Sequence, residues 1–159
     1  MPDATYQTGV YRQQGSNTLV IGTGGNVVFD EGGILPRTLR TRLAIGTVNS
    51  GATLLAAVVG KAYRVHDVAM IAVGGAATTG TTIDILGTQA AAGVKLCAFG
   101  QAALTQSALV RAGSAGGVLL ADGASFAACD ANTAITIGKT GSSFTVVVSI
   151  DVLLTYTLE

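Results

Sequence analysis

The residues that could do chemistry in this chain are few, and they lack the neighbours that a catalytic site needs. His66 is the only histidine, and the adjacent Asp67 invites comparison with a general-base pair. Because adjacent strand residues point to opposite faces, these two side chains cannot form a dyad, and we expect His66 to be exposed. The segment Gly123-Ala124-Ser125-Phe126-Ala127 lacks the second glycine of a Gly-x-Ser-x-Gly nucleophile elbow. The sequence therefore predicts that the protein is not an enzyme.

Candidate ligand-binding residues are equally sparse. The segment Gly22-Thr23-Gly24-Gly25 lacks the third glycine and the following helix of a dinucleotide-binding loop. Cys97 and Cys129 have no metal-type spacing, and we expect them to be buried free thiols. Asp122 and Asp130 flank a turn and could hold a cation loosely, although turn chemistry alone explains two such aspartates. We expect no cofactor and no metal.

Composition indicates a single domain whose surface is covered by other proteins. The chain has 159 residues, of which only 11% are charged, whereas ordinary soluble proteins have about 25%. Net charge is zero, which favours association, and so poorly charged a surface is easier to explain when subunits bury it. Neither a signal peptide nor a membrane-spanning apolar stretch is visible, so we expect assembly in a cytoplasm and no membrane partner.

The charges that the chain has are unevenly distributed. Residues 36–64 contain Arg37, Arg40, Arg42, Lys61 and Arg64 but no acidic residue. A nucleic-acid-binding protein would show a denser basic face, so we expect no nucleic-acid partner. The three closely spaced arginines fit either a docking patch for an acidic protein surface or a solvated strand face, and both interpretations remain open.

A short repeat near the start of the chain indicates self-association. Residues 19–25 and 27–33 each place three apolar residues and two spacers before a Gly-Gly turn. Units this short normally stack on at least two neighbours, which here would come from other chains, although two ordinary strands with glycine turns have the same spacing. Pro36 then interrupts regular structure. We therefore divide the chain into an N-terminal arm with short β repeats (1–35) and a β-sandwich domain (36–159).

The remainder of the chain is rich in β-branched residues and glycine turns, which predicts an all-β antiparallel sandwich or barrel. The run 52–59 is continuously apolar, as in a strand buried on both faces. Residues 62–73 alternate, with Tyr63, Val65 and Asp67 on one face and Arg64 and His66 on the other. Residues 104–110 are ambiguous and could form a short helix. The strand candidates are residues 38–48, 52–59, 62–73, 81–86, 94–99, 116–121, 134–138 and 144–158.

Several segments resemble a known group of proteins. The opening Val10-Tyr11-Arg12-Gln13-Gln14-Gly15, followed by the Leu-Val-Ile-Gly-Thr-Gly-Gly unit, is similar to the start of many tailed-bacteriophage particle proteins. Other parts of the chain resemble small phage proteins that coat the capsid, namely residues 51–55, 60–65, 134–138 and 150–156. The resemblance implies a decoration protein (a cement or minor capsid protein) with a jelly-roll-like domain and an extended N-terminal arm.

This resemblance implies a structural function on the virion. The protein would bind and stabilise the outside of the capsid as a homotrimer that bridges subunits of the major capsid protein, after assembly in the host cytoplasm. Tyr and Arg are enriched at binding hot spots, so the candidate partner-binding residues are Tyr6, Tyr11, Arg12, Arg37, Arg40 and Arg42.

The alternative function is a head- or tail-fibre module that binds a receptor or a carbohydrate, because related repeats occur in phage fibres. Sugar sites usually present exposed aromatic side chains. The chain has four tyrosines, four phenylalanines and no tryptophan, which argues against that alternative.

Overall fold

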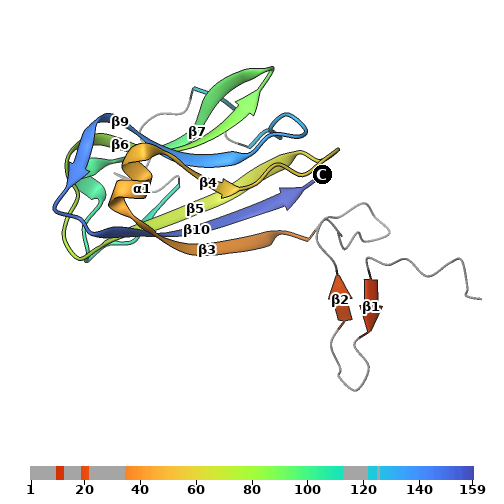
Figure 1. Cartoon of the computed structure of the whole chain (residues 1–159), viewed down its shortest axis with the longest axis horizontal. Coiled ribbons are helices and arrows are strands. Elements are labelled where there is room, and N and C mark those ends of the chain that lie inside the picture. Colours follow the sequence, from red (N-terminus) through yellow and green to blue (C-terminus); the bar gives the residue numbers. More distant parts are fainter. Residues whose placement is uncertain (1–9, 13–18, 22–34, 113–121, 125) are drawn as a thin grey trace, which may run out of the picture.

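Two antiparallel β-sheets packed face to face form the body of the protein (Figure 1). The structure is a computed structural model and describes residues 10–12, 19–21, 35–112, 122–124 and 126–159. One sheet has the strand order β3-β10-β5-β8 and the other has β4-β9-β6-β7. The strands are β3 (Arg37–Ala44), β4 (Ala52–Leu55), β5 (Tyr63–Val73), β6 (Thr78–Gln89), β7 (Ala92–Gly100), β8 (Val110–Arg111), β9 (Ile135–Thr145) and β10 (Ser149–Leu158). The prediction of an all-β antiparallel sandwich is confirmed.

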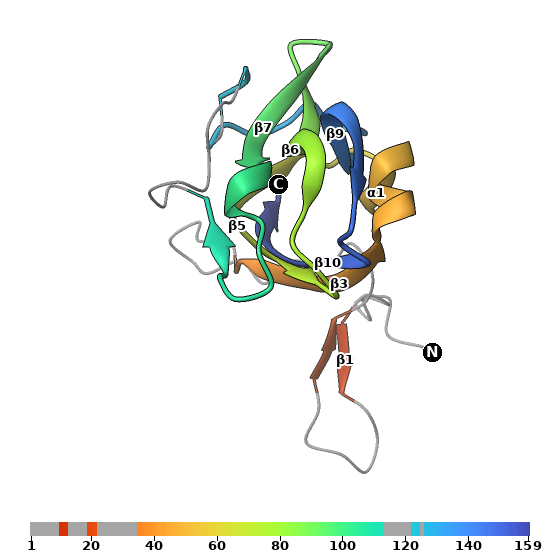
Figure 2. The same cartoon turned by 90° about the vertical axis from the view of Figure 1, so that its left-hand side faces the viewer.

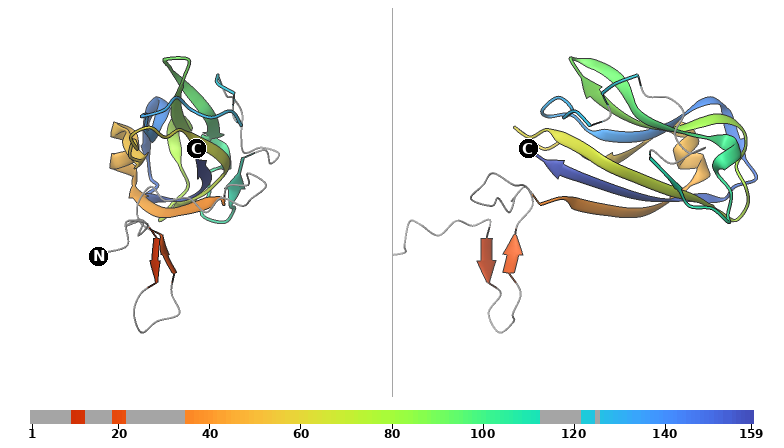
Figure 3. Two further views of the ribbon diagram at one scale, coloured as in Figure 1. Left: turned by 90° about the vertical axis from the view of Figure 1, so that its right-hand side faces the viewer. Right: turned by 180° about the vertical axis from the view of Figure 1, so that it is seen from behind.

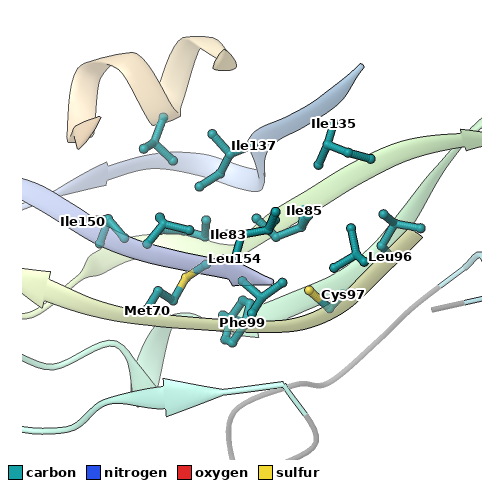
Figure 4. Packing of buried hydrophobic residues seen from close by; sticks show 14 of the residues in the cluster. Met70, Ile83, Ile85, Leu96, Cys97, Phe99, Ile135, Ile137, Ile150 and Leu154 are labelled. Carbon is teal, nitrogen blue, oxygen red and sulfur yellow. The ribbon is translucent and has the colours of Figure 1, made fainter. Parts of the chain in front are cut away.

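The core lies between the inner faces of the two sheets. Figure 4 shows isoleucines of β6 and β9 facing Met70, Ile150 and Leu154 of the other sheet, with Phe99 beside them. Each of these side chains is essentially inaccessible to solvent, and burial of a side chain of this size contributes about 1.5–3 kcal/mol. Cys97 and Cys129 are buried free thiols, as predicted.

A short helix, α1 (Ile45–Ser50), replaces the last part of the strand predicted over residues 38–48. The side chain of Asn49 pairs with the backbone of Phe144, donating from Nδ2 to the carbonyl at 3.0 Å and accepting from the amide at 2.8 Å. The helix therefore covers the part of the β9 edge that β4 is too short to reach. Gly51, with φ of 84°, then turns the chain into β4.

Two other predicted strands were wrong in extent. The segment 144–158 is not one strand, because β9 ends at Thr145 and β10 begins at Ser149 in the opposite sheet. The run 52–59 forms a strand only over Ala52–Leu55, at the edge of its sheet, and Val59 is 93% exposed. Apolar character alone did not distinguish a strand from a turn in either segment.

The structure shows the conformation of residues 104–110, which the sequence left ambiguous. A single 3-10 turn, η1 (Gln101–Ala103), precedes them, Leu104 is fully buried, and Val110 begins β8. The possible helix over residues 104–110 does not form. The predicted strand 116–121 lies outside the described residues.

A β-bulge at His66 breaks the alternation that the sequence suggests for β5. Thr155 of β10 pairs with Asp67, whereas Tyr156 pairs with Val65, so His66 is the extra residue. Tyr63 and Val65 are therefore buried together with Val68 and Met70, and the predicted common face of Tyr63, Val65 and Asp67 was wrong. His66 is exposed, as expected.

A separate two-stranded ribbon precedes the sandwich. Strand β1 (Val10–Arg12) pairs antiparallel with β2 (Leu19–Ile21), so the first copy of the repeat supplies β2. Figure 1 shows this ribbon outside the sandwich, near the end at which β3 begins. The second copy, residues 27–33, lies outside the described residues.

Candidate functional site

The outer face of the β3-β10-β5-β8 sheet carries two of the three closely spaced arginines. Along β3, Arg40 and Arg42 occupy exposed positions, while the alternate positions are half-buried. Arg37 belongs to the half-buried set and lies opposite Tyr156 of β10. The structure therefore brings Arg40 and Arg42 onto one surface and separates Arg37 from them.

Arg42 is engaged by an acidic side chain of the next strand. Asp151 lies directly opposite it on β10, and the guanidinium donates to both carboxylate oxygens, at 2.6 and 2.7 Å. The hydrogen bond from Arg42 lowers the pKa of Asp151 and raises the pKa of Arg42. Arg111 of β8 similarly donates to Asp67 of β5, at 2.5 and 2.8 Å. In these ion pairs, carboxylates of the same sheet neutralise the charges of Arg42 and Arg111.

Arg40 is the exception on this face. It makes no hydrogen bond or salt bridge with a described residue, but its charge adds to the hydrogen bond from Arg42 in lowering the pKa of Asp151, and Arg40 and Asp151 both line a hollow of about 250 Å³. Leucine side chains border the hollow, since Leu109 is 62% exposed and Leu153 is 38% exposed. A guanidinium above an apolar floor can donate two parallel hydrogen bonds to a carboxylate, while the leucines contact the aliphatic part of the same partner. This arrangement, the Arg40 hollow, suits an acidic side chain of another protein.

The remaining predicted anchors lie away from this hollow. Tyr11 and Arg12 are on β1, where they oppose Val20 and Leu19 of β2. Tyr6 lies outside the described residues. Sequence reasoning also missed Leu109 and Leu153, because only the fold pairs β10 with β3 and β5, and β8 with β5.

His66 and the adjacent Asp67 interact with different side chains. His66 Nε2 lies 3.0 Å from Thr157 Oγ1, while Asp67 accepts hydrogen bonds from Arg111. Around His66, Arg64 donates to both oxygens of Glu159, at 2.7 and 3.0 Å, and this hydrogen bond lowers the pKa of that carboxyl group. The cluster fastens the last residue of the chain to β5.

Asp84 is a second polar centre, which the sequence analysis did not single out. It lies on β6 and is only 2% exposed. Its carboxylate accepts hydrogen bonds from Thr82 Oγ1 at 2.7 Å and Thr140 Oγ1 at 2.6 Å, and Lys95 Nζ lies 3.9 Å away. Two hydroxyls and an ammonium group satisfy this carboxylate, so its geometry is that of a structural anion. Among the described residues, no three His, Cys, Asp or Glu side chains are grouped to hold a metal ion.

The two turn aspartates bind backbone amides. Asp130 accepts from the amides of Ala90 and Ala91, at 3.1 and 2.8 Å, and both alanines have positive φ in the turn between β6 and β7. Asp122 accepts from the amide of Lys95. Turn chemistry therefore accounts for both carboxylates, in agreement with the simpler interpretation of the sequence.

A second hollow, of about 540 Å³, lies over strands β6, β7 and β9. Its lining includes Thr88, Lys95, Asp122 and Thr136 but no aromatic side chain. Aromatic rings usually provide the stacking surface of a sugar site, so this hollow gives little support to carbohydrate binding.

Comparison of the chain with protein-family models, curated proteins and solved structures gave no match. In the described part of the chain, no helix has the length and apolar character needed to cross a membrane. Among the surfaces described, the Arg40 hollow combines a guanidinium that makes no hydrogen bond to a described residue with exposed apolar side chains. It is therefore the best-defined candidate for binding a partner.

Proposed function

We propose that this protein is a structural component of a bacteriophage particle that binds the outside of the capsid, stabilises it and bridges major capsid subunits as a homotrimer. The observation that carries the proposal is the strand order of the sandwich. From β3 to β10, consecutive strands alternate between the two sheets, except for the β6–β7 hairpin. This order supports a jelly roll, an eight-stranded architecture used by viral capsid domains and lectins.

The Arg40 hollow gives the proposed capsid contact its chemistry. Arg42 and Arg111 are already paired across strands, which leaves Arg40 available for an acidic side chain of the capsid. Residues 1–35 precede β3, the strand that carries Arg40, so the arm and the hollow are joined through one strand. Contacts made together by the arm and the hollow raise the effective affinity, because the second contact becomes intramolecular.

The repeat in the arm and the low charge of the chain support self-association, here proposed as a trimer. A repeat unit of eight residues needs neighbours to bury its apolar side chains, and other copies of the same chain can supply them. In this proposal the protein is made in the host cytoplasm, joins the capsid surface, and uses neither a membrane nor nucleic acid.

A fibre module that binds a receptor or a carbohydrate is the second possibility, because jelly rolls also form lectins and fold alone does not determine function. The larger hollow lacks aromatic side chains, so we place this function second.

Co-sedimentation of the full chain with capsids purified without it tests the proposal. Arg40→Ala is expected to weaken binding about tenfold, because a hydrogen bond to a charged group contributes about 1.5–3 kcal/mol. Lys139→Ala is the matched control. It also removes one positive charge, but from the opposite sheet, where the ammonium group donates to the carbonyl of Gly141. Absence of binding by the unmodified chain would refute the capsid function, and equal binding by Arg40→Ala would refute the site.

A further inference from the structure

The described connections at one end of the sandwich carry no charged side chain. These are residues 45–51, 74–77, 101–108 and 146–148, which contain no Asp, Glu, Lys, Arg or His. Figure 2 looks onto this uncharged end, with α1 and the starts of β6 and β10 nearest the viewer. The opposite end contains Lys61, Arg64, Asp130 and Glu159. The charged side chains of the connections are therefore gathered at one end of the sandwich.

The most exposed part of the uncharged end is a turn made of valines. Val146 is 66% exposed and Val148 is 62% exposed, while Val147 between them is buried. Tight turns between strands ordinarily use Gly, Asn, Asp or Ser. Val146 also has a φ of 69°, a conformation that a β-branched residue rarely adopts. Neither solvation nor backbone geometry explains valine at these positions, whereas a second surface that covers the two side chains would.

The valines are held in place by the adjacent turn between β5 and β6. A Cβ atom at Gly74 would lie 2.6 Å from Cγ2 of Val148, and one at Gly75 would lie 2.8 Å from the carbonyl oxygen of Val146. Only glycine permits this approach, since both residues also have positive φ. The exposed apolar side chains are therefore fixed before any partner arrives, which lowers the entropic cost of binding.

The polar groups beside the valine turn are hydroxyls. Thr145 Oγ1 lies 2.9 Å from Thr78 Oγ1 and 3.1 Å from Thr79 Oγ1. A hydroxyl group both donates and accepts, so a surface of hydroxyls and apolar groups is complementary to a copy of itself. A charged surface lacks this property, because equivalent charges repel one another where symmetry brings them together.

We propose that the uncharged end is the contact between copies of this chain, with the valine turns converging on the symmetry axis. The inference rests on the proposed function, because it assigns a surface to the trimer. Figure 3 shows that the C-terminus and the start of β3 lie at the opposite end from α1. Copies joined at their uncharged ends would therefore hold the starts of β3, to which the arms are attached, away from the axis.

Sedimentation of the full chain over a range of concentrations tests this contact. Val146→Asp places equivalent negative charges together at the axis, and aspartate tolerates a positive φ better than valine does. We expect the variant to fold, with a thermal midpoint at or above that of the unmodified chain, and to need about tenfold more protein or higher for half-association. Val59→Asp is the matched control, because that valine is also exposed but lies two positions before Lys61 of the charged end. It should sediment like the unmodified chain.

Val148→Asp provides a second variant that leaves residue 146 unchanged. The proposal is overturned if a folded Val146→Asp or Val148→Asp protein associates as the unmodified chain does, or if the unmodified chain is monomeric throughout. Capsid co-sedimentation separates this result from the proposed function. If the chain binds capsids and neither substitution changes its self-association, the proposed function is retained and the proposed contact is refuted. If the substitutions weaken self-association but the unmodified chain does not bind capsids, only the contact is retained.

Discussion

Asp84→Ala tests whether the buried carboxylate organises the second sheet. The substitution removes the acceptor of hydrogen bonds from Thr82 and Thr140 and the counter-charge of Lys95. The three donors lie on three strands, β6, β7 and β9. Because Asp84 is only 2% exposed, water does not easily replace the lost acceptor. The expected effect is on stability and not on binding.

The structure allows the magnitude to be worked out. A hydrogen bond to a charged group contributes about 1.5–3 kcal/mol, and the carboxylate accepts two of them. Removing one partner of a buried ion pair typically costs about 3–5 kcal/mol. Both routes give a loss of about 3–5 kcal/mol, a large part of the roughly 5–15 kcal/mol that stabilises a domain.

Chemical denaturation of the full chain measures this loss as a shift in the unfolding midpoint at constant slope. Asp67→Ala is the control, because it removes a carboxylate from a solvent-facing pair with Arg111. It should destabilise the protein far less. A loss for Asp84→Ala below about 1 kcal/mol would refute the reasoning, because a neutral hydrogen bond alone contributes that much.

Three further changes have defined outcomes. The pKa of Asp151 is lowered by a hydrogen bond from its arginine partner, so this carboxylate stabilises the fold above the ordinary aspartate pKa of 3.8. In thermal melts, the advantage over Asp151→Asn should vanish as pH falls through the lowered native value, and an advantage that persists in acid would contradict the assignment. Burial raises the pKa of the Cys97 thiol to about 12, so this thiol should resist a disulfide reagent at pH 8 until denaturant is added. Gly80→Ala should lower the melting temperature, because the new Cβ would lie 2.4 Å from the ring of Phe144. Gly93→Ala, with no atom within 4 Å, should lower it less.

The longer strands were predictable where β-branched residues and glycine turns coincide, as in β5 and β7. The valine turn was not, because Val146 and Val148 resemble strand residues and no Gly or Asn marks the turn. Helix α1 has six residues, which is too short for a helical period to appear in the sequence. The bulge at His66 depends on pairing with β10, so local alternation put Val68 and Met70 on the same face as His66, whereas both are buried.

The candidate site was predictable only in part. The sequence grouped Arg37, Arg40 and Arg42, and the structure places only Arg40 and Arg42 on one exposed face. The partner of Arg42 is 109 positions away in the chain, however, so nothing local distinguishes the paired arginine from the unpaired one. Asp84 shows a similar limit, because nothing in the adjacent Ile83 and Ile85 indicates that the fold buries all three side chains.

The distribution of charge links the two proposed contacts. Arg42, Arg64 and Arg111 each bind a carboxylate of another segment, so these charges stabilise the fold and are unavailable to partners. Arg40 makes no hydrogen bond to a carboxylate among the described residues, and in our proposal it contacts a different, acidic protein. The uncharged end offers the opposite chemistry, which suits an identical copy and disfavours a charged partner. Under both proposals one chain would bind itself and a capsid at the same time, because the two surfaces differ in charge and so select different partners.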